Sequence, residues 1–342
     1  MGPKKDAPKA SGGGEGEEGN DPAVFLSNYQ KLSKFHGLPV STGVNKCLTD
    51  EEKSPMTQLL IDNTYDVLGA GGCRCLMSAL LGQGPANGVV KGGPYRLINS
   101  IRIWRSNIGD DGVSAIAEVL RLGGGDVKIS YLELLDNNVG PRGGIALAES
   151  LSRGKNLSLM TLKLDYNGTF QTEGCANLCR GLRTNSTLKQ LHLPYCKLTF
   201  EAGKALSEVL NYEKSGLTAL NLCGNPLTGS GLFYLCEGLL TNKVLETLNI
   251  SDNCIEESDE DIAGLQQLAD VISAGGESAL ASVDMSYNRI GERGAEVLSP
   301  ALARNKSIKD FYVDSSLPEK LFEVLFRDGA GGKGKKGKKG KK

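Results

Sequence analysis

Histidine and cysteine are the residues with which this chain could carry out acid–base, nucleophilic or metal-assisted chemistry. It contains two histidines, His36 and His192, and neither stands at a spacing typical of a metal site or a catalytic triad. Of the nine cysteines, the closest pairs are Cys73 with Cys75 and Cys175 with Cys179, and neither pair makes a Cys-x-x-Cys motif. Such cysteines are more often small core residues than ligands. The sequence therefore predicts no enzyme activity, no catalytic residue, no metal site, no cofactor and no small-molecule substrate.

Aromatic and charged residues offer a different chemistry, the binding of another macromolecule. The only tryptophan and five of the ten tyrosines occupy outward-facing positions of a repeated pattern, together with several charged residues. These residues are therefore predicted to share one surface. Trp, Tyr and Arg dominate the energetics of protein interfaces. The predicted partner-binding residues are Arg102, Trp104, Arg105, Tyr131, Glu133, Lys163, Tyr166, His192, Tyr195, Tyr287 and Tyr312, with Trp104, Tyr131, Tyr166 and Tyr195 at the centre. The alternative is that these tyrosines serve only the packing of neighbouring repeats.

The pattern that positions these residues recurs every 28 to 35 residues from Ile98 onward. Its clearest copy has apolar residues at Leu245, Leu248 and Ile250, followed by Asn253 and Ile255, at offsets 0, 3, 5, 8 and 10 from the start. Seven copies are clear and two are degenerate. In chain order they begin at Met56 (degenerate), Ile98, Ile129, Leu159, Leu188, Leu217, Leu245, Leu280 and Ile308 (degenerate).

Each copy predicts a strand, a turn and a helix. The apolar residues at offsets 3 and 5 alternate with exposed positions, as in a strand with one buried face. The asparagine at offset 8 can satisfy backbone groups where the chain leaves the strand; Cys196 replaces it in one clear copy and Ser106 in another. A glycine-rich turn such as 109–112 then precedes an amphipathic helical pattern such as 113–120. No unit can bury its core alone, so the units must stack, with parallel strands inside and wider helices outside.

The pattern Leu-x-x-Leu-x-Leu-x-x-Asn/Cys-x-Leu-Gly-x-x-Gly resembles the ribonuclease-inhibitor-like class of leucine-rich repeats over residues 56–316. The resemblance implies an α/β solenoid of horseshoe shape, with parallel strands on the concave face and helices on the convex face. It does not specify the function. That class includes inhibitors, innate-immune sensor arrays, a GTPase activator of Ran, and cytoskeletal and ciliary scaffolds.

The two ends differ from the array and divide the chain into five segments. Asp21 and Pro22 are a favourable helix start, because Asp caps the first turn and Pro is pre-organised for it. The segments are a disordered N-terminal tail (1–20), an N-terminal helical cap (21–55), the array of about nine units (56–316), a C-terminal cap helix (317–328) and a disordered Lys/Gly tail (329–342). Within the array, the acidic run 256–261 is interpreted as a helix N-terminus favoured by the helix dipole, with a docking site for a basic partner as the alternative.

Charge is distributed unevenly along the chain. Residues 21–328 carry 29 basic and 36 acidic residues, whereas residues 329–342 carry seven lysines and no acid. Such a tail should bind acidic polymers through counterion release. Acidic tubulin tails, anionic lipid and nucleic acid all fit this chemistry, nucleic acid through the tail alone. The tail could also fold back on the acidic body or serve only solubility. The lysines concerned are Lys333, Lys335, Lys336, Lys338, Lys339, Lys341 and Lys342.

The sequence contains no apolar run of bilayer length and no signal peptide, so we expect a cytoplasmic protein that does not insert into membranes. Its predicted function is a non-catalytic scaffold for protein–protein interaction. Lys/Pro and Lys/Gly termini are similar to those of ciliary axoneme proteins, which suggests tubulin or axonemal complex subunits as partners and the cytoskeleton or cilium as location. A cytosolic regulatory inhibitor or adaptor is the alternative. A Ran-type GTPase activator is a further one; it implies an early arginine such as Arg105, but an acidic tail where this chain has a basic one.

Overall fold

The computed structural model describes most of the chain between Asn20 and Gly329. The described ranges are 20–50, 55–85, 88–123, 125–274 and 278–329. The two tails predicted to be disordered therefore lie outside the described residues, apart from these two end positions.

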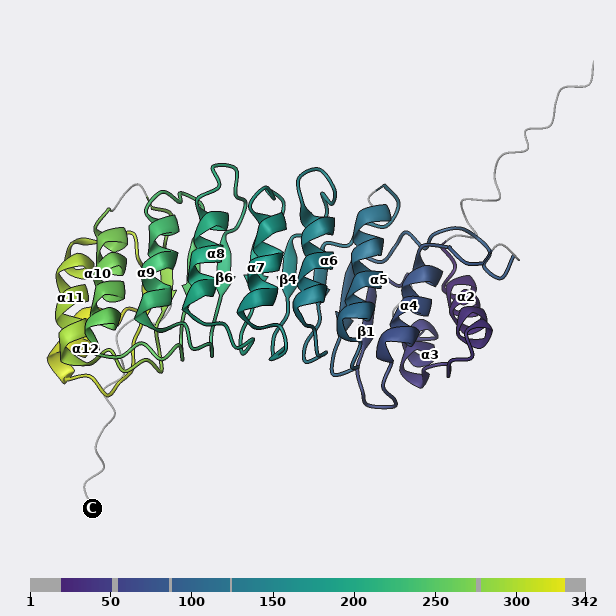
Figure 1. Ribbon diagram of the computed structural model, residues 1–342, viewed down its shortest axis with the longest axis horizontal. Coiled ribbons are helices and arrows are strands. Elements are labelled where there is room, and N and C mark those ends of the chain that lie inside the picture. The colour runs from purple at the N-terminus through teal and green to yellow at the C-terminus, as the bar shows by residue number, and fades with distance from the viewer. Residues whose placement is uncertain (1–19, 51–54, 86–87, 124, 275–277, 330–342) are drawn as a thin grey trace, which may run out of the picture.

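In the described part of the chain, nine parallel strands form one sheet along one side of an elongated molecule, and they follow one another in chain order. Figure 1 shows the helices of successive units standing side by side in a row in front of this sheet. Neighbouring strands are in register, so that Leu132 pairs with Leu162 and Leu162 with Leu191. The strands are β1 (Gln58–Ile61), β2 (Ser100–Ile103), β3 (Tyr131–Glu133), β4 (Thr161–Lys163), β5 (Gln190–His192), β6 (Ala219–Asn221), β7 (Thr247–Asn249), β8 (Ser282–Asp284) and β9 (Asp310–Tyr312).

One helix follows each strand and returns the chain to the start of the next. Parallel strands lie about 4.8 Å apart, whereas packed helices need about 8–10 Å, so the stack curves with the sheet on the inner side. The predicted leucine-rich-repeat solenoid is confirmed. The helices between strands are α4 (Gly69–Leu80), α5 (Gly109–Leu122), α6 (Pro141–Leu151), α7 (Gln171–Leu182), α8 (Phe200–Leu210), α9 (Thr228–Leu239), α10 (Asp259–Ser273) and α11 (Gly291–Arg304).

Buried asparagines at offset 8 hold neighbouring repeats together. The Asn167 Oδ1 accepts the backbone N–H groups of Asn137 and Val139 at 2.9 and 3.0 Å. Its Nδ2 donates to the carbonyl oxygens of Leu134 and Leu164 at 2.7 and 2.8 Å. One amide therefore satisfies four backbone groups of two repeats, which would otherwise be buried without partners. Asn225 and Asn288 make the equivalent bonds in later repeats.

A second set of asparagines, which the sequence analysis did not predict, lies three residues before the repeat start. Asn185 Nδ2 donates to the carbonyl of Leu151 at the end of α6, the helix one repeat earlier, 2.7 Å away. Its Oδ1 accepts the N–H groups of Thr187 and Leu188. Each of these residues thereby ties the end of one helix to the loop that follows the helix of the next repeat. The equivalents are Asn156, Asn242 and Asn305.

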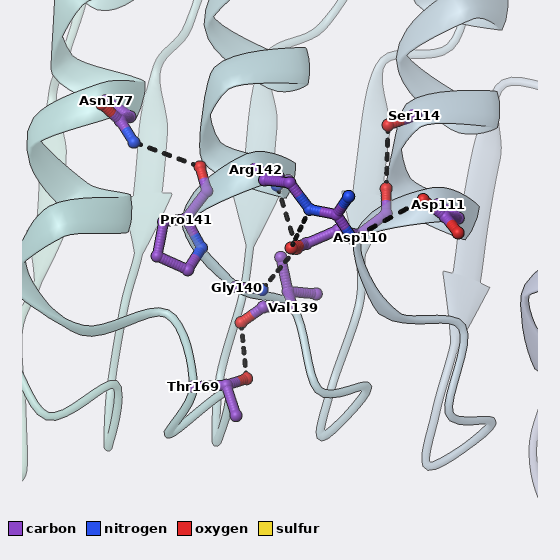
Figure 2. A network of polar contacts seen from close by, with 10 residues as sticks. Asp110, Asp111, Ser114, Val139, Gly140, Pro141, Arg142, Thr169 and Asn177 are labelled. Carbon is purple, nitrogen blue, oxygen red and sulfur yellow. Dashed lines mark hydrogen bonds and ion pairs between the residues drawn. The ribbon is translucent and has the colours of Figure 1, made fainter.

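The start of α6 is also held from a neighbouring repeat, as Figure 2 shows. The Asp110 Oδ1 accepts the N–H groups of Gly140 and Gly143 at 2.6 and 2.9 Å, and Arg142 lies 3.5 Å from the same carboxylate. A carboxylate at a helix N-terminus is favoured by the helix dipole. In the acidic run 256–261, the buried Asp261 plays this role towards Gly229 at the start of α9. The run also starts a helix of its own, because α10 begins at Asp259.

The N-terminal end is covered by two helices, α2 (Pro22–Phe35) and α3 (Thr42–Leu48). The Asp21 side chain accepts the N–H of Ala23 and starts α2, as its position in the sequence indicates. The sequence analysis did not distinguish α3, whose first turn is capped by the Ser41 side chain. The Tyr29 hydroxyl accepts the Ser41 N–H at 3.1 Å and so joins the two helices.

At the other end, α12 (Glu319–Leu325) is followed by a segment that returns antiparallel to β9. Phe311 and Arg327 exchange two backbone hydrogen bonds of 3.0 and 2.9 Å. The Arg327 guanidinium donates to the carbonyls of Asn305 and Ile308, both at 2.9 Å, and to that of Leu302. This side chain satisfies carbonyl groups that no further repeat covers.

We expect Asn167→Ala to lower the free energy of unfolding by about 2–3 kcal/mol, because it leaves four buried backbone groups without their partner. Chemical denaturation of the purified chain measures the loss. The matched control is Asn99→Ala, at an exposed asparagine, and it should change the free energy of unfolding by less than about 0.5 kcal/mol. Equal stability of the two variants would contradict the role of the ladder.

Candidate binding surface

Side chains at offsets 2, 4 and 6 project from the face of the sheet opposite to the core, called the strand face here. The register places Arg102, Glu133, Lys163 and His192 in one row across β2 to β5. Four predicted residues from separate repeats are thus brought side by side. The same row continues with Asn221, Asn249, Asp284 and Tyr312.

Tyr131 is the centre of a charged cluster on the strand face. The Arg102 guanidinium lies 4.7 Å from its ring centroid and the Lys163 Nζ 5.7 Å. Its hydroxyl donates to the Glu133 Oε2 at 2.7 Å, and the Arg102 Nε lies 3.8 Å from the same oxygen. Burial is the main cause that raises the pKa of the Tyr131 hydroxyl, and the hydrogen bond to Glu133 raises this pKa further. The ring is therefore fixed in place by cation–π and hydrogen-bond contacts.

Several buried polar atoms around this cluster have no hydrogen-bond partner among the described residues. They are the Ser100 Oγ, the Arg102 Nε, the Trp104 Nε1 and the Asp165 Oδ1, all on the strand face of β2 and of the repeat that contains β4. Burial raises the pKa of the Asp165 carboxyl, which Lys163 partly opposes. Buried polar groups without partners are costly.

Tyr166 and Tyr195 form an exposed aromatic stack beside the cluster. Their ring centroids are 4.7 Å apart and their planes differ by 15°. Both occupy offset 7 in the left-handed backbone region, with φ of +61° and +54°, and 55% and 38% of their surfaces are exposed. The next repeat has Gly224 at this offset, where a Cβ atom would come 2.2 Å from the Tyr195 ring. The glycine leaves the space in which Tyr195 lies against the backbone.

The other predicted residues are placed apart from the stack. Tyr287 is the most exposed, at 76%, and Gly224 and Asp252 occupy the equivalent positions between it and Tyr195. Tyr312 packs edge-on against Phe326, with centroids 5.8 Å apart, and so belongs partly to the C-terminal end. Arg105 is exposed at offset 7, next to Trp104.

His192 is half-buried in the row between Lys163 and Asn221. Burial, together with the charge of Lys163, lowers the pKa of its imidazole to about 4, and Glu133 opposes this only in part. The side chain is therefore neutral near pH 7.

The cysteines and the groups that could bind a metal can be examined in the described residues. Seven of the nine cysteines are buried, and burial raises the pKa of the Cys73 thiol to about 12. Within the described ranges, no three His, Cys, Asp or Glu side chains are grouped so that they could hold a metal ion. Among the helices described, none combines the length and apolar character that a bilayer span requires.

Sequence reasoning missed residues that shape this surface without being aromatic or basic. Gly224 could have been found, because a glycine stands where two preceding repeats have tyrosine. Ser100 and Asp165 could not, since their lack of a hydrogen-bond partner depends on the neighbouring repeats.

Comparison with known proteins identifies the repeats. A family model described as Leucine Rich repeat matches residues 241–258 and 280–299. The chain is 29% identical over 207 residues to Ribonuclease inhibitor of Mus musculus, which covers 60% of this chain and 42% of that protein. It is 30% identical over 181 residues to NACHT, LRR and PYD domains-containing protein 14 of Mus musculus, which covers 53% of this chain and 17% of that protein. The chain contains leucine-rich repeats and is similar to ribonuclease inhibitor, and it spans less than half the length of these curated relatives.

Among solved structures, similarity extends over most of the chain at low identity. A chain from the crystal structure of the Rad7 and Elc1 complex in yeast is 13% identical, with a TM-score of 0.45, and covers 89% of this chain and 79% of its own length. The structure titled Leiomodin-1 Actin-Binding Site 2 is 18% identical, with a TM-score of 0.38, and covers 46% of this chain and 87% of its own length.

The pKa of His192 should be measurable by NMR, and we expect its Cε1–H resonance to titrate near pH 4. Because this pKa lies below the ordinary value of 6.5, the unfolded chain takes up the proton first. Stability is therefore fully present above about pH 6.5 and falls as the pH drops towards 4. In His192→Gln this component of the pH dependence should disappear.

Lys163→Gln is the matched control, since it removes the second cause of the shift and leaves the burial unchanged. It should return the pKa of His192 only part of the way to its ordinary value. A His192 titration near 6.5 in the unaltered chain would show that the imidazole is not buried as described.

Proposed function

We propose that this chain is a non-catalytic scaffold that binds a protein partner on its strand face, centred on Trp104, Tyr131 and the Tyr166–Tyr195 stack. The observation that carries the proposal is the stack itself, two exposed aromatic rings held 4.7 Å apart next to a fixed charged cluster. Exposed, pre-positioned aromatic rings bind a partner with little loss of side-chain freedom. Solenoids use their inner surface for such binding.

A protein ligand fits the chemistry of this face better than a small molecule. Arg102, Glu133, Lys163 and Asp165 provide donors and acceptors of both charges over several neighbouring repeats. A relative whose name states that it inhibits a ribonuclease supports a protein as the ligand. Catalysis is disfavoured at His192, because an imidazole with a pKa near 4 is a poor proton acceptor at neutral pH.

We further propose a cytoskeletal setting, with a microtubule assembly such as the ciliary axoneme as the site of action. Support comes from the lysines of 333–342, whose charge is complementary to acidic polymers such as tubulin tails. In this arrangement the strand face selects the protein partner and the tail adds a salt-sensitive attachment.

The aromatic stack is tested with Tyr166→Asn combined with Tyr195→Asn. Asparagine tolerates the left-handed backbone at both positions, so the fold should be preserved. Immobilised full-length chain is used to isolate partners from salt-extracted axonemes, and binding of an identified partner is then measured by titration. We expect the variant to raise the Kd at least about tenfold.

The control is Phe35→Ala combined with Phe200→Ala, which removes two exposed aromatic side chains outside the strand face. It should leave the Kd unchanged. Undiminished binding by the Tyr166/Tyr195 variant, with an unaltered circular dichroism spectrum, would rule out the stack as the centre of the interface.

The basic tail is tested by microtubule co-sedimentation of the full chain and of a variant in which all seven lysines of 333–342 are Gln. The full chain should pellet with microtubules at about 50 mM salt and be released at about 500 mM, because counterion release makes such binding salt-dependent. The Gln variant should stay in the supernatant throughout. Pelleting of that variant at both salt concentrations would contradict a role for the tail.

A further inference from the structure

The C-terminal half of the strand face differs in charge from the half that carries the aromatic stack. Across β7 to β9 and the turns that follow, its carboxylates are Asp252, Asp284, Asp310 and Asp314, called the acidic half here. Burial is the largest cause that raises the pKa of the Tyr312 hydroxyl, and the negative charges of Asp310, Asp328 and Asp284 raise it further. Asp284 and Asp310 of the acidic half therefore lie near the Tyr312 ring of β9.

In the described ranges, no lysine or arginine forms an ion pair with the acidic half. The Asp284 carboxylate accepts the Ser286 N–H at 2.9 Å and the Asn249 Nδ2 at 3.3 Å. The Asp314 carboxylate accepts the Ser316 N–H at 2.8 Å. These neutral donors leave the negative charge of the surface in place, whereas Arg102 and Lys163 balance the acids of the other half.

The chain itself is directed to this surface. After α12 it runs antiparallel to β9 through the pairing of Arg327 with Phe311. The backbone N–H of Gly329 then donates to the Asp310 Oδ1 at 2.8 Å. The last described residue is thus attached to a carboxylate of the acidic half, and the next charged residues in the sequence are the seven lysines of 333–342.

We propose that the Lys/Gly segment 333–342 docks on the acidic half of the strand face of its own chain. An extended residue spans about 3.3–3.6 Å, so Lys333, four residues beyond Gly329, reaches about 13–14 Å. Neighbouring strands lie about 4.8 Å apart, which puts Asp284 on the adjacent strand β8 within that reach. The tether also keeps the segment at an effective concentration on the order of millimolar.

Docking has a consequence for binding to other molecules. The lysines that bind an acidic polymer are the same ones that cover the acidic half, so the polymer and the strand face compete for them. A basic partner would in turn have to displace the segment. The inference does not rest on the aromatic stack, whose residues lie in the other half of the strand face.

Zero-length carbodiimide cross-linking of the dilute full chain tests the contact directly. We expect intramolecular links from the lysines of 333–342 to Asp284, Asp310 or Asp314, lost at about 500 mM salt because screening weakens exposed pairs. Links only to the helix-side acids Glu256, Glu257 and Glu260, or only between chains, would overturn the proposal. Tyr166→Asn/Tyr195→Asn should not change the links, so the proposed function and the docking fail independently.

A binding assay with poly-glutamate as the probe tests the competition. Asp284→Asn/Asp310→Asn/Asp314→Asn keeps the acceptor oxygens but removes the charge. Full-length chain with these changes should bind poly-glutamate about three- to tenfold more tightly than the matched control, because the lysines are no longer occupied. The control, Glu118→Gln/Glu237→Gln/Glu296→Gln, neutralises three exposed acids on α5, α9 and α11. Equal affinities would overturn the proposal.

If the triple Asp variant does not fold, the chain with all seven tail lysines changed to Gln provides the second measurement. Its acidic half is uncovered, so it should bind poly-lysine about three- to tenfold more tightly than the unaltered chain. Unchanged affinity for poly-lysine would show that the segment does not occupy this surface.

Discussion

The constraint on which the rest of the structure depends is the burial of backbone polar groups where the chain leaves each strand. These points are buried in the stack of repeats, and each turn directs N–H and C=O groups to the interior. The side-chain amide of Asn167 satisfies four of them at once, one in its own repeat and three in the preceding repeat, at distances of 2.7–3.0 Å. Where Cys196 replaces asparagine, its thiol still donates to the carbonyl of Leu164. The ladder therefore joins repeats as well as completing each turn.

This turn geometry also decides how the binding surface is built. Residues just before the asparagine adopt the left-handed backbone conformation, which costs free energy for any residue with a side chain. The buried amide bonds offset that cost, and the side chain at this place is turned to the edge of the strand face. Tyr166 and Tyr195 meet there because their repeats are adjacent and in register, and Gly224 leaves the space for the second ring. The same bonds that close the core thus display the aromatic pair.

The strand face has two parts with different chemistry, which gives the proposed scaffold two separate attachments. Around Tyr131 opposite charges balance one another and fix the ring, so the surface is ready for a structured partner. Around Tyr312 carboxylates dominate, and the chain end that carries the lysines begins beside Asp310. A partner of the first part needs shape and hydrogen-bond complementarity, whereas a ligand of the second part needs mainly charge. The two kinds of binding should therefore differ in their dependence on salt.

The sequence by itself determined the fold. The offsets of leucine, asparagine and glycine within the repeat indicate which residues are buried, which lie in the turn and which start the helix. It also identified the residues that face away from the core, since alternation along a strand is a local property. It did not distinguish α3, the asparagines represented by Asn185, or the sealing role of Arg327, because each depends on a contact with a distant segment. Likewise, only the tertiary structure decided that Tyr166 stacks on Tyr195, that Asp165 lacks a hydrogen-bond partner and that His192 stays neutral. Register and burial set these properties, and both arise only when one repeat is packed against the next.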